Sequence, residues 1–328
     1  MKKFLFKRLL QSFLILFFVG LLIYSMMRLL PSSYVETRAR TLSQQPGAKS
    51  YDEWLVQLKA AYGLEQGILP GYLHWLGNAL QGDFGDSWQW NKPVITKFQE
   101  VIGYSIFLAA TAFILEIFLS IPAGILAARR QYSKLDHTIT VVALIGISLP
   151  SFFFATILKY LFSVKLGWFD LYGIVGRMHE QYSPFKQFLD VAEHMLLPIL
   201  TLTITNIGSL IRFTRTNMLE VLHSDFIRTA RANGLPEHKV IYQHAFRNTL
   251  LPLITVLGSS LPELFGGALI TETLFQIPGI GYTAYQSMVN GDIPFSMFYM
   301  LFLAVLTLLG NLLADILYAA VDPRVQMV

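Results

Sequence analysis

Long apolar segments alternate with polar stretches along the whole chain, and six of them reach the length of a membrane span. Each has about 20 residues, which as an α-helix crosses a hydrocarbon core of roughly 30 Å. The pattern therefore predicts an all-α integral membrane protein with six transmembrane helices. The predicted spans are Leu9–Leu30, Val101–Ala128, His137–Phe162, Glu193–Ile211, Leu251–Leu274 and Phe295–Ala320.

The composition agrees with a membrane protein. Of the 328 residues, 54% are hydrophobic and 14% are charged, whereas charged residues make up roughly a quarter of a soluble domain. The chain has no cysteine, which excludes a disulfide framework and a thiolate metal site. The net charge of +4 is typical of basic cytoplasmic loops. No aromatic and basic pattern predicts nucleic acid as a partner.

The charges of the connecting segments predict the orientation in the membrane. Basic residues outnumber acids at the N-terminus and in the connections after the second and fourth spans, whereas residues 163–190 carry both signs equally. Both termini and the two basic connections are therefore expected in the cytoplasm. The basic residues behind this assignment are Lys2, Lys3, Lys7, Arg8, Arg129, Arg130, Lys134, Arg212, Arg215, Arg228, Arg231, Lys239 and Arg247.

Residues 31–100 are too polar to span a membrane and are predicted to form a small extracytoplasmic region. Within it, Trp54–Tyr62 has the spacing of an amphipathic helix that ends at Gly63, and Trp75, Trp88 and Trp90 are typical of interfacial anchors. Three parts are predicted: 1–30, the cytoplasmic N-terminus and first span; 31–100, the extracytoplasmic region; and 101–328, a core with five spans and the loop 212–250.

The loop 212–250 contains a short basic stretch with the pattern of helix, break and helix. Asp225 is expected to cap a first helix, and Gly234 to end it in the left-handed conformation. Pro236 is expected in the first turn of a second helix. A helix as short as the first one is marginal in water and needs a surface to lie against.

The spacing of apolar residues in the first short helix suggests what that surface is. Phe226, Ile227 and Ala230 are expected on one side of the helix, away from its two arginines. A stretch of this kind in an arbitrary loop is an ordinary solvated connection. Here an apolar face, a glycine break and a proline start coincide, which favours a helix that docks into a groove on a partner.

The sequence contains no motif for covalent chemistry or for nucleotide binding. The patterns G-x-x-x-x-G-K-[ST] and H-E-x-x-H and a serine nucleophile elbow are absent, and the seven histidines are scattered. No catalytic, cofactor or metal site is therefore predicted in this chain.

Glu116 and Glu263 lie within predicted spans, where an ionisable side chain is a candidate functional residue because a charge is costly in lipid. Both are expected about 17 Å from the cytoplasmic ends of their spans, at about 1.5 Å per residue. They could face one translocation path, or each could be neutralised by burial or hydrogen-bonded between helices. Asn206, in the fourth span, is either a third residue of such a path or a packing residue.

Several sequence motifs occur in a fixed order. The basic stretch reads D-F-I-R-T-A-R-A-N-G from Asp225 to Gly234. The other motifs are RLLP (Arg28–Pro31), YGL (Tyr62–Leu64), GDFGDSW (Gly82–Trp88), SLPSFF (Ser148–Phe153), FSVKLGWF (Phe162–Phe169), HAFRNTLLP (His244–Pro252), ETLFQIPGIG (Glu272–Gly281) and LYAAVDPR (Leu317–Arg324). Together they resemble the inner-membrane permease subunits of ABC importers, in the oligopeptide, dipeptide and nickel branch. Arg228 and Thr229 depart from the E-A-A consensus of the wider family, in the form that the peptide branch shows.

The resemblance implies a type I importer permease fold with a coupling helix that lies in a groove of an ATPase subunit. Pro278, Gly279 and Gly281 would form an extracytoplasmic gate loop. The chain would work in lipid of the bacterial inner membrane with a homologous second permease, two cytoplasmic ATPases that bind ATP–Mg, and an extracytoplasmic substrate-binding protein. The residues of the implied coupling helix are Asp225, Phe226, Ile227, Arg228, Thr229, Ala230, Arg231, Gly234 and Leu235.

Three alternatives to a peptide permease stay open. Within the family, the cargo could be nickel or a nickel chelate. A secondary transporter driven by protons through Glu116 and Glu263 and an intramembrane enzyme are alternatives from other classes, and neither accounts for the basic stretch in the loop 212–250.

Overall fold

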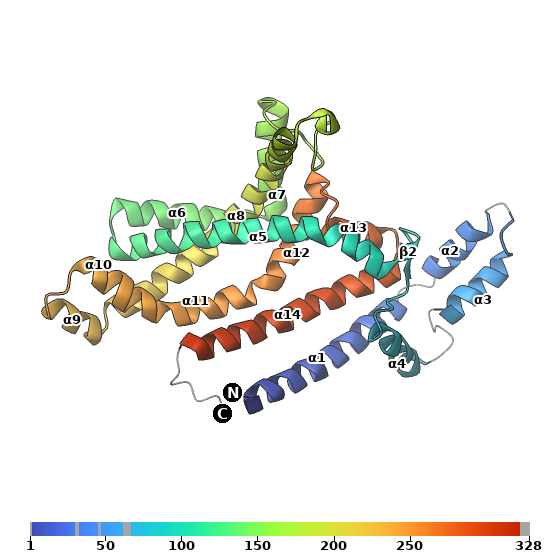
Figure 1. Cartoon of the computed structure of the whole chain (residues 1–328), viewed down its shortest axis with the longest axis horizontal. Helices are drawn as coiled ribbons and strands as arrows, with labels where there is room; N and C mark the ends of the chain where they lie inside the picture. Colours follow the sequence, from blue (N-terminus) through green and yellow to red (C-terminus); the bar gives the residue numbers. More distant parts are fainter. Residues whose placement is uncertain (1, 30–32, 45–46, 62–66, 322–328) are drawn as a thin grey trace. The chain divides into compact units, whose positions relative to one another are not determined.

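The computed structural model describes residues 2–29, 33–44, 47–61 and 67–321, and within them the chain is almost entirely helical (Figure 1). Strands β1 (Asp86–Ser87) and β2 (Lys92–Pro93) form a small antiparallel ribbon. The α-helices are α1 (Lys2–Leu29), α2 (Ser33–Ser43), α3 (Tyr51–Ala61), α4 (Ile68–Ala79), α5 (Val94–Arg129), α6 (Lys134–Ser148), α7 (Ser151–Leu158), α8 (Pro184–Leu222), α9 (Asp225–Ala232), α10 (Glu237–Lys239), α11 (Arg247–Ser259), α12 (Leu261–Phe275), α13 (Ile280–Val289) and α14 (Ile293–Val321).

The described helices account for the six predicted spans. Five are long and apolar enough to cross a membrane, and a sixth span results if the bent pair α6 and α7 is counted as one. The predicted fourth span was too short at both ends, since α8 runs from Pro184 to Leu222. The five continuous candidates are Phe6–Leu29, Val94–Arg129, Pro184–Leu222, Glu237–Phe275 and Ile293–Leu317.

The third span is bent by 103° between Ser148 and Ser151. Proline has no N–H to donate and disfavours the helical conformation in the residue before it. Leu149 accordingly has an extended backbone, with φ −89° and ψ 125°, and α7 starts directly after Pro150. The S-L-P-S sequence is therefore a corner and not a continuous helix.

The chain forms two compact units. Unit 1 comprises Met1–Ile102 and Thr283–Leu308, and unit 2 comprises Gly103–Tyr282 and Leu309–Val328. Residues 283–308 belong to the same compact unit as the N-terminal region.

In unit 1, aromatic side chains join α1 to α4. The ring of Tyr72 lies 5.8 Å from that of Tyr24 and 6.2 Å from that of Trp75, and the Tyr72 hydroxyl donates to the carbonyl of Phe17. Trp88 is buried in an apolar cluster with α2 and α3. The prediction that Trp88 anchors at a membrane interface is therefore wrong. Helix α3 packs its apolar side into this cluster as expected, but the predicted helix end at Gly63 and the YGL motif lie outside the described residues, as do Pro31 of RLLP and residues 322–324 of LYAAVDPR.

The GDFGDSW motif has a structural role in unit 1. Buried Asp292 accepts hydrogen bonds from the Ser87 hydroxyl and from the backbone N–H groups of Gln89 and Phe295. The indole of Trp90 donates to the Ser287 hydroxyl at 3.3 Å. The β1–β2 ribbon is thereby fixed to the junction of α13 and α14.

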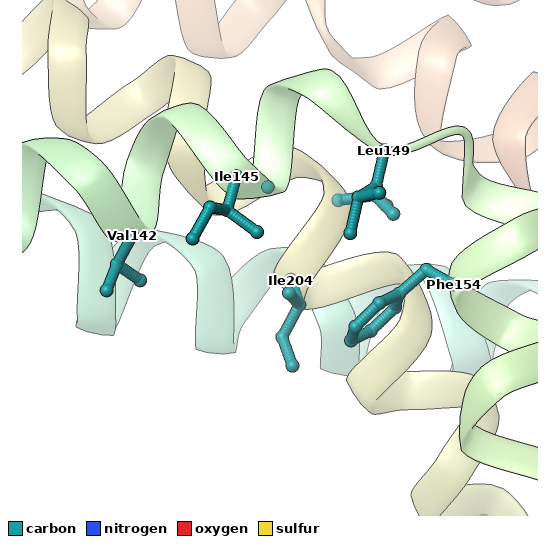
Figure 2. A pocket seen from close by; sticks show the side chains of 7 residues that line it. Val142, Ile145, Leu149, Phe154 and Ile204 are labelled. Carbon is teal, nitrogen blue, oxygen red and sulfur yellow. The ribbon is translucent and has the colours of Figure 1, made fainter.

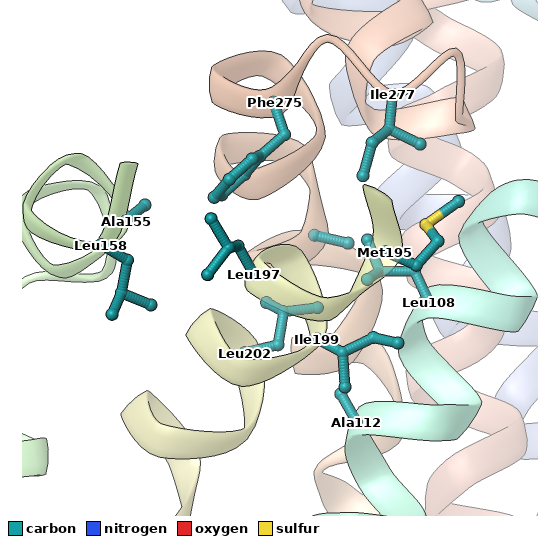
Figure 3. Packing of buried hydrophobic residues seen from close by; sticks show 11 residues of the cluster. Leu108, Ala112, Ala155, Leu158, Met195, Leu197, Ile199, Leu202, Phe275 and Ile277 are labelled. Atoms are coloured by element: carbon teal, nitrogen blue, oxygen red, sulfur yellow. The ribbon is translucent and has the colours of Figure 1, made fainter. Parts of the chain in front are cut away.

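The apolar core of unit 2 forms where α5, α7, α8 and α12 meet (Figure 3). Glycines allow α8 to approach its neighbours closely. A Cβ on Gly146 of α6 would lie 2.8 Å from the carbonyl oxygen of Ile204, and one on Gly124 of α5 would lie 2.9 Å from that of Ile211. Small residues at such contacts are typical of helices packed in a membrane.

Candidate functional site

Helix α9 ends as the sequence predicts and begins one residue earlier than predicted. Gly234 has φ +75°. The N–H of Leu235 donates to the carbonyl of Ala230 and that of Gly234 to the carbonyl of Arg231, which is the hydrogen-bond pattern of a Schellman motif. The capping position belongs to Ser224, so the prediction that Asp225 caps the helix is wrong. Asp225 is the first helical residue, where its negative charge favours the positive end of the helix dipole.

The predicted apolar face of α9 is divided between two sides of the helix. Ile227 is 0% exposed and Ala230 is 7% exposed, whereas the neighbouring Phe226 is 47% exposed. The prediction that these three residues form one face is therefore wrong. Ile227 and Ala230 hold the helix onto its own chain, and Phe226 points away from it.

The cluster beneath α9 brings together residues from distant parts of unit 2. Helices α5 and α8 and the π-helical turn Val240–Phe246 all contribute to it. Its fully buried members besides Ile227 and Ala230 are Ile125, Ala128, Met218, Val240, Ile241 and Ala245, and Leu235 packs against them.

The outer face of α9 consists of Asp225, Phe226, Arg228 and Thr229, all of which are exposed. Arg228 and Asp225 form a surface ion pair at 3.3 Å, in which the Arg228 side chain is 73% exposed. Such a pair contributes little to stability in solvent. The outer face is therefore a small apolar and charged surface that the described residues of the chain do not cover.

The turn after α9 is fixed by an ion pair. The Arg231 guanidinium donates to the Glu237 carboxylate at 2.9 Å, and this hydrogen bond raises the pKa of Arg231 above its usual value. Pro236 occupies the capping position and the next helix begins at Glu237, so the proline lies one position before its predicted place.

A second ion pair ties α6 to the last third of α8, the helix that leads into α9. Arg215 of α8 donates from Nε and Nη2 to the two oxygens of Asp136, at 2.6 and 2.8 Å, and Asp136 is buried. The Tyr132 N–H also donates to this carboxylate at 2.9 Å. The 79 positions that separate Asp136 from Arg215 hide this pairing from the sequence pattern.

The two candidate acidic residues of the path, Glu116 and Glu263, both lie in unit 2. Glu116, on α5, is 7% exposed, whereas Glu263, in the first turn of α12, is exposed. Asn206, on α8, is half-buried. None of the three lines the hollow of about 110 Å³ beside the bent third span, where Val142, Ile145, Leu149, Phe154 and Ile204 are labelled (Figure 2).

The predicted gate loop joins α12 to α13 and is mostly enclosed. Gly279 and Gly281 are buried, and Pro278 is half-buried. Their neighbour is Glu272, a buried residue that the sequence analysis treated only as part of a motif.

The connection 166–183 and the first turns of α8 together carry a cluster of titratable side chains that the sequence pattern does not reveal. Asp190 accepts hydrogen bonds from the N–H of Gly176 and contacts Nδ1 of His179 at 2.6 Å. Nε2 of His194 lies 3.1 Å from a carboxylate oxygen of Asp170. The described residues contain no group of three or more His, Asp or Glu side chains that could hold a metal ion. The hydrogen bonds of this cluster join the connection to α8.

Comparisons with known proteins agree with this architecture. Residues 120–327 match the family described as binding-protein-dependent transport system inner membrane component. Oligopeptide transport system permease protein AppB of Bacillus subtilis is 38% identical over 99% of this chain and 100% of its own length. Oligopeptide transport system permease protein OppB of Haemophilus influenzae is 34% identical over the same shares.

Among solved structures, a chain of the MetNI methionine ABC transporter in an inward-facing conformation has a similar fold. It matches with a TM-score of 0.55 and 16% sequence identity, over 70% of this chain and 97% of the MetNI chain.

Proposed function

The chain belongs to the family of binding-protein-dependent transport system inner membrane components, and from this premise we propose that it is a permease subunit of an ABC importer for di- or oligopeptides. Peptide cargo is favoured over nickel because the two relatives compared are named as oligopeptide permeases and match over their full lengths. The chain forms half of a translocation path in the bacterial inner membrane, with both termini in the cytoplasm.

The observation that carries this proposal is the construction of α9. Ile227 and Ala230 fasten the helix to α5 and α8, while Phe226 and Arg228 face outward. A short helix that is packed on one side and exposed on the other can dock into a groove on a partner. The apolar Phe226 side chain would be buried in the groove, and the charged residues would make polar contacts at its rim. The outer face of α9 therefore docks on an ATPase subunit.

The ATPase subunits supply the energy and this chain transmits the motion. Two cytoplasmic ATPases bind ATP–Mg, and their closure moves α9. Because α9 packs on α5 and α8 and Arg215 ties α8 to α6, the motion reaches the spans as a rigid-body change. This chain performs no covalent chemistry and holds no cofactor.

Two further parts complete the proposed importer. A homologous second permease forms the other half of the path, and an extracytoplasmic binding protein delivers the cargo. Glu116 on α5, Glu263 on α12 and Asn206 on α8 are the candidate polar residues of the path in this chain.

The test is reconstitution of the complex that copurifies with the tagged chain from its native host. We expect two ATPases, a second permease and uptake of a peptide digest into proteoliposomes that requires ATP and the binding protein. Uptake of nickel and not of peptides would correct the cargo. If an uncoupler abolishes uptake while ATP depletion leaves it intact, the chain is instead a proton-coupled transporter. If the chain alone converts a substrate chemically, it is instead an enzyme.

A further inference from the structure

Glu272 is a fully enclosed carboxyl group at the end of α12, with 0% of its surface exposed. Its two oxygens accept hydrogen bonds from other elements. The Ser105 hydroxyl on α5 donates to Oε1 at 2.6 Å, and the Tyr282 N–H on α13 donates to Oε2 at 3.0 Å. One side chain therefore joins three helices.

The donors from α13 are the N–H groups that a helix start leaves without partners. The N–H of Tyr282 donates to Glu272 directly, and that of Ile280 donates to the Ser105 hydroxyl at 2.7 Å. The first turn of α13 is thus satisfied by Glu272 and its hydrogen-bonded neighbour. A side chain with fewer acceptor sites leaves buried donors unpaired, which is costly.

The glycines of the P-G-I-G sequence fit around this carboxyl group. A Cβ on Gly279 would meet the carboxyl group of Glu272, and a Cβ on Gly281 would lie 2.5 Å from Cα of Leu269. On either side of Gly279, Ile277 and Ile280 are fully buried. The turn between α12 and α13, called the α12–α13 corner below, is therefore tightly packed, and its conformation depends on Glu272.

This corner lies at the opposite end of unit 2 from α9. Phe275 and Ile277 pack with Met195 and Leu197 in the first half of α8, whereas α9 follows the last residue of that helix. The 39 residues of α8 span about 58 Å at 1.5 Å each. The N–H of Gly173, in the exposed connection 166–178, also donates to the carbonyl of Phe275.

We propose that Glu272 is a positioning residue that holds the α12–α13 corner closed at the extracytoplasmic end of the permease. The carboxyl group fixes the turn through the first N–H groups of α13 and fixes both to α5 through Ser105. The inference rests on the proposed importer function, because that function is what places this end of unit 2 on the extracytoplasmic side. Loss of one acceptor oxygen frees the corner to open without a signal from the ATPases.

The test uses single cysteines, which the cysteine-free sequence allows without background. Ile280→Cys is placed in the otherwise native chain, in cells that express the whole complex, and is labelled from outside with a membrane-impermeant maleimide. We expect protection in this chain and labelling about ten-fold faster when Glu272→Gln is added. That change corresponds to about 1.4 kcal/mol in the opening equilibrium, in the range of a lost buried hydrogen bond.

Matched variants separate local opening from other effects. Glu193→Gln, an exposed carboxyl group on α8, should leave Ile280→Cys protected. Trp168→Cys, at a 61% exposed position, should be labelled from outside in every background. Ile227→Cys, tested with a permeant reagent, should stay protected beside Glu272→Gln, whereas general unfolding would expose it. Ser105→Ala should accelerate labelling of Ile280→Cys less than Glu272→Gln does, because it leaves the direct bonds of α13 to Glu272 in place.

A functional measurement then separates positioning from stability alone. Glu272→Gln should lower the amount of peptide taken up per ATP hydrolysed by the purified complex. A purely structural defect would instead lower the uptake rate and the ATP hydrolysis rate in proportion and leave their ratio unchanged. Protection of Ile280→Cys in the Glu272→Gln chain, or labelling of Trp168→Cys only from the inside, would overturn the inference. Failure of the unmodified complex to show ATP-driven uptake would instead overturn the proposed function, whatever the labelling result.

Discussion

At the scale of single residues, the adjacent Phe226 and Ile227 face opposite sides of α9. Ile227 is fully buried in its own chain, whereas Phe226 is exposed on the outer face of α9. Phe226→Asp should therefore leave the chain folded and remove apolar area needed by a partner. We expect normal membrane levels and loss of the copurifying ATPases in a mild-detergent pull-down. Phe185→Asp, a matched change at an exposed phenylalanine at the other end of α8, should retain them.

Truncation of Ile227 should lower the stability of the chain, in contrast to Phe226→Asp. Ile227→Ala removes side-chain atoms from the cluster beneath α9 and should cost about 2–5 kcal/mol of stability, as other buried large-to-small changes do. A lower unfolding temperature of the purified chain would show this. If Ile227→Ala kept native stability while Phe226→Asp lowered it, the assignment of the two faces would be wrong.

Gly234 provides a graded test of the turn after α9. Its φ of +75° is strained for other residues, yet a Cβ there would meet nothing within 4 Å, so the cost of Gly234→Ala is conformational, about 1–2 kcal/mol. Gly234→Asn should cost less. Gly234→Pro should cost most and uncouple transport, because proline cannot adopt this φ and loses the N–H that bonds Arg231. Thermal unfolding and uptake should follow the order Gly, Asn, Ala, Pro, and equal values for all four would contradict it.

At the scale of elements, the Asp136–Arg215 pair joins α6 to α8. Arg215→Ala leaves a buried carboxylate without its cation and should cost about 3 kcal/mol, because the uncompensated charge stays enclosed. Asp136→Asn with Arg215→Ala should cost less than the sum of the single changes. Unfolding temperatures of the four proteins measure this coupling, and strict additivity would show that the pair does not act as a unit.

The number and approximate positions of the membrane helices could be predicted from sequence, because apolar length identifies a span. The ends of α8 could not, because this helix continues into polar sequence beyond the predicted span at both ends. The bend at Leu149–Pro150 could have been predicted as well, since proline and the residue before it carry the local signal. The end of α9 at Gly234 is local in the same way, and the prediction was right. Helix starts were less certain, because Ser224, Asp225 and Pro236 are all suitable near an N-terminus.

The faces of α9 and the role of Glu272 could not be predicted by the same reasoning. Ile227 is buried by Ile125 and Met218, which come from other helices, so its sequence spacing to Phe226 does not reveal which of the two is covered. Glu272 bonds Ser105 across 167 positions. Such partners depend on tertiary packing, and one sequence contains no local signal for them.

At the scale of the whole molecule, unit 2 connects the outer face of α9 to the corner at Glu272 through one long helix. The C-terminal part of α8 lies in the cluster beneath α9, and its first half lies in the core with Phe275 and Ile277. A displacement of α9 would therefore move α8, and with it the core residues that pack on the other end of that helix. This continuity gives the proposed ATPase docking a physical route to the far end of the path.

Docking of the ATPases should also be visible as stability of the chain itself. A partner that binds only the folded state stabilises it by about 2.7 kcal/mol at 100 times its dissociation constant. The purified chain should therefore unfold at a higher temperature when its ATPases are added, with a shift that grows with their concentration. Phe226→Asp should abolish the shift, whereas Phe185→Asp should preserve it. An equal shift in the Phe226→Asp chain would place the ATPase contact elsewhere, because α9 presents no other exposed large apolar side chain.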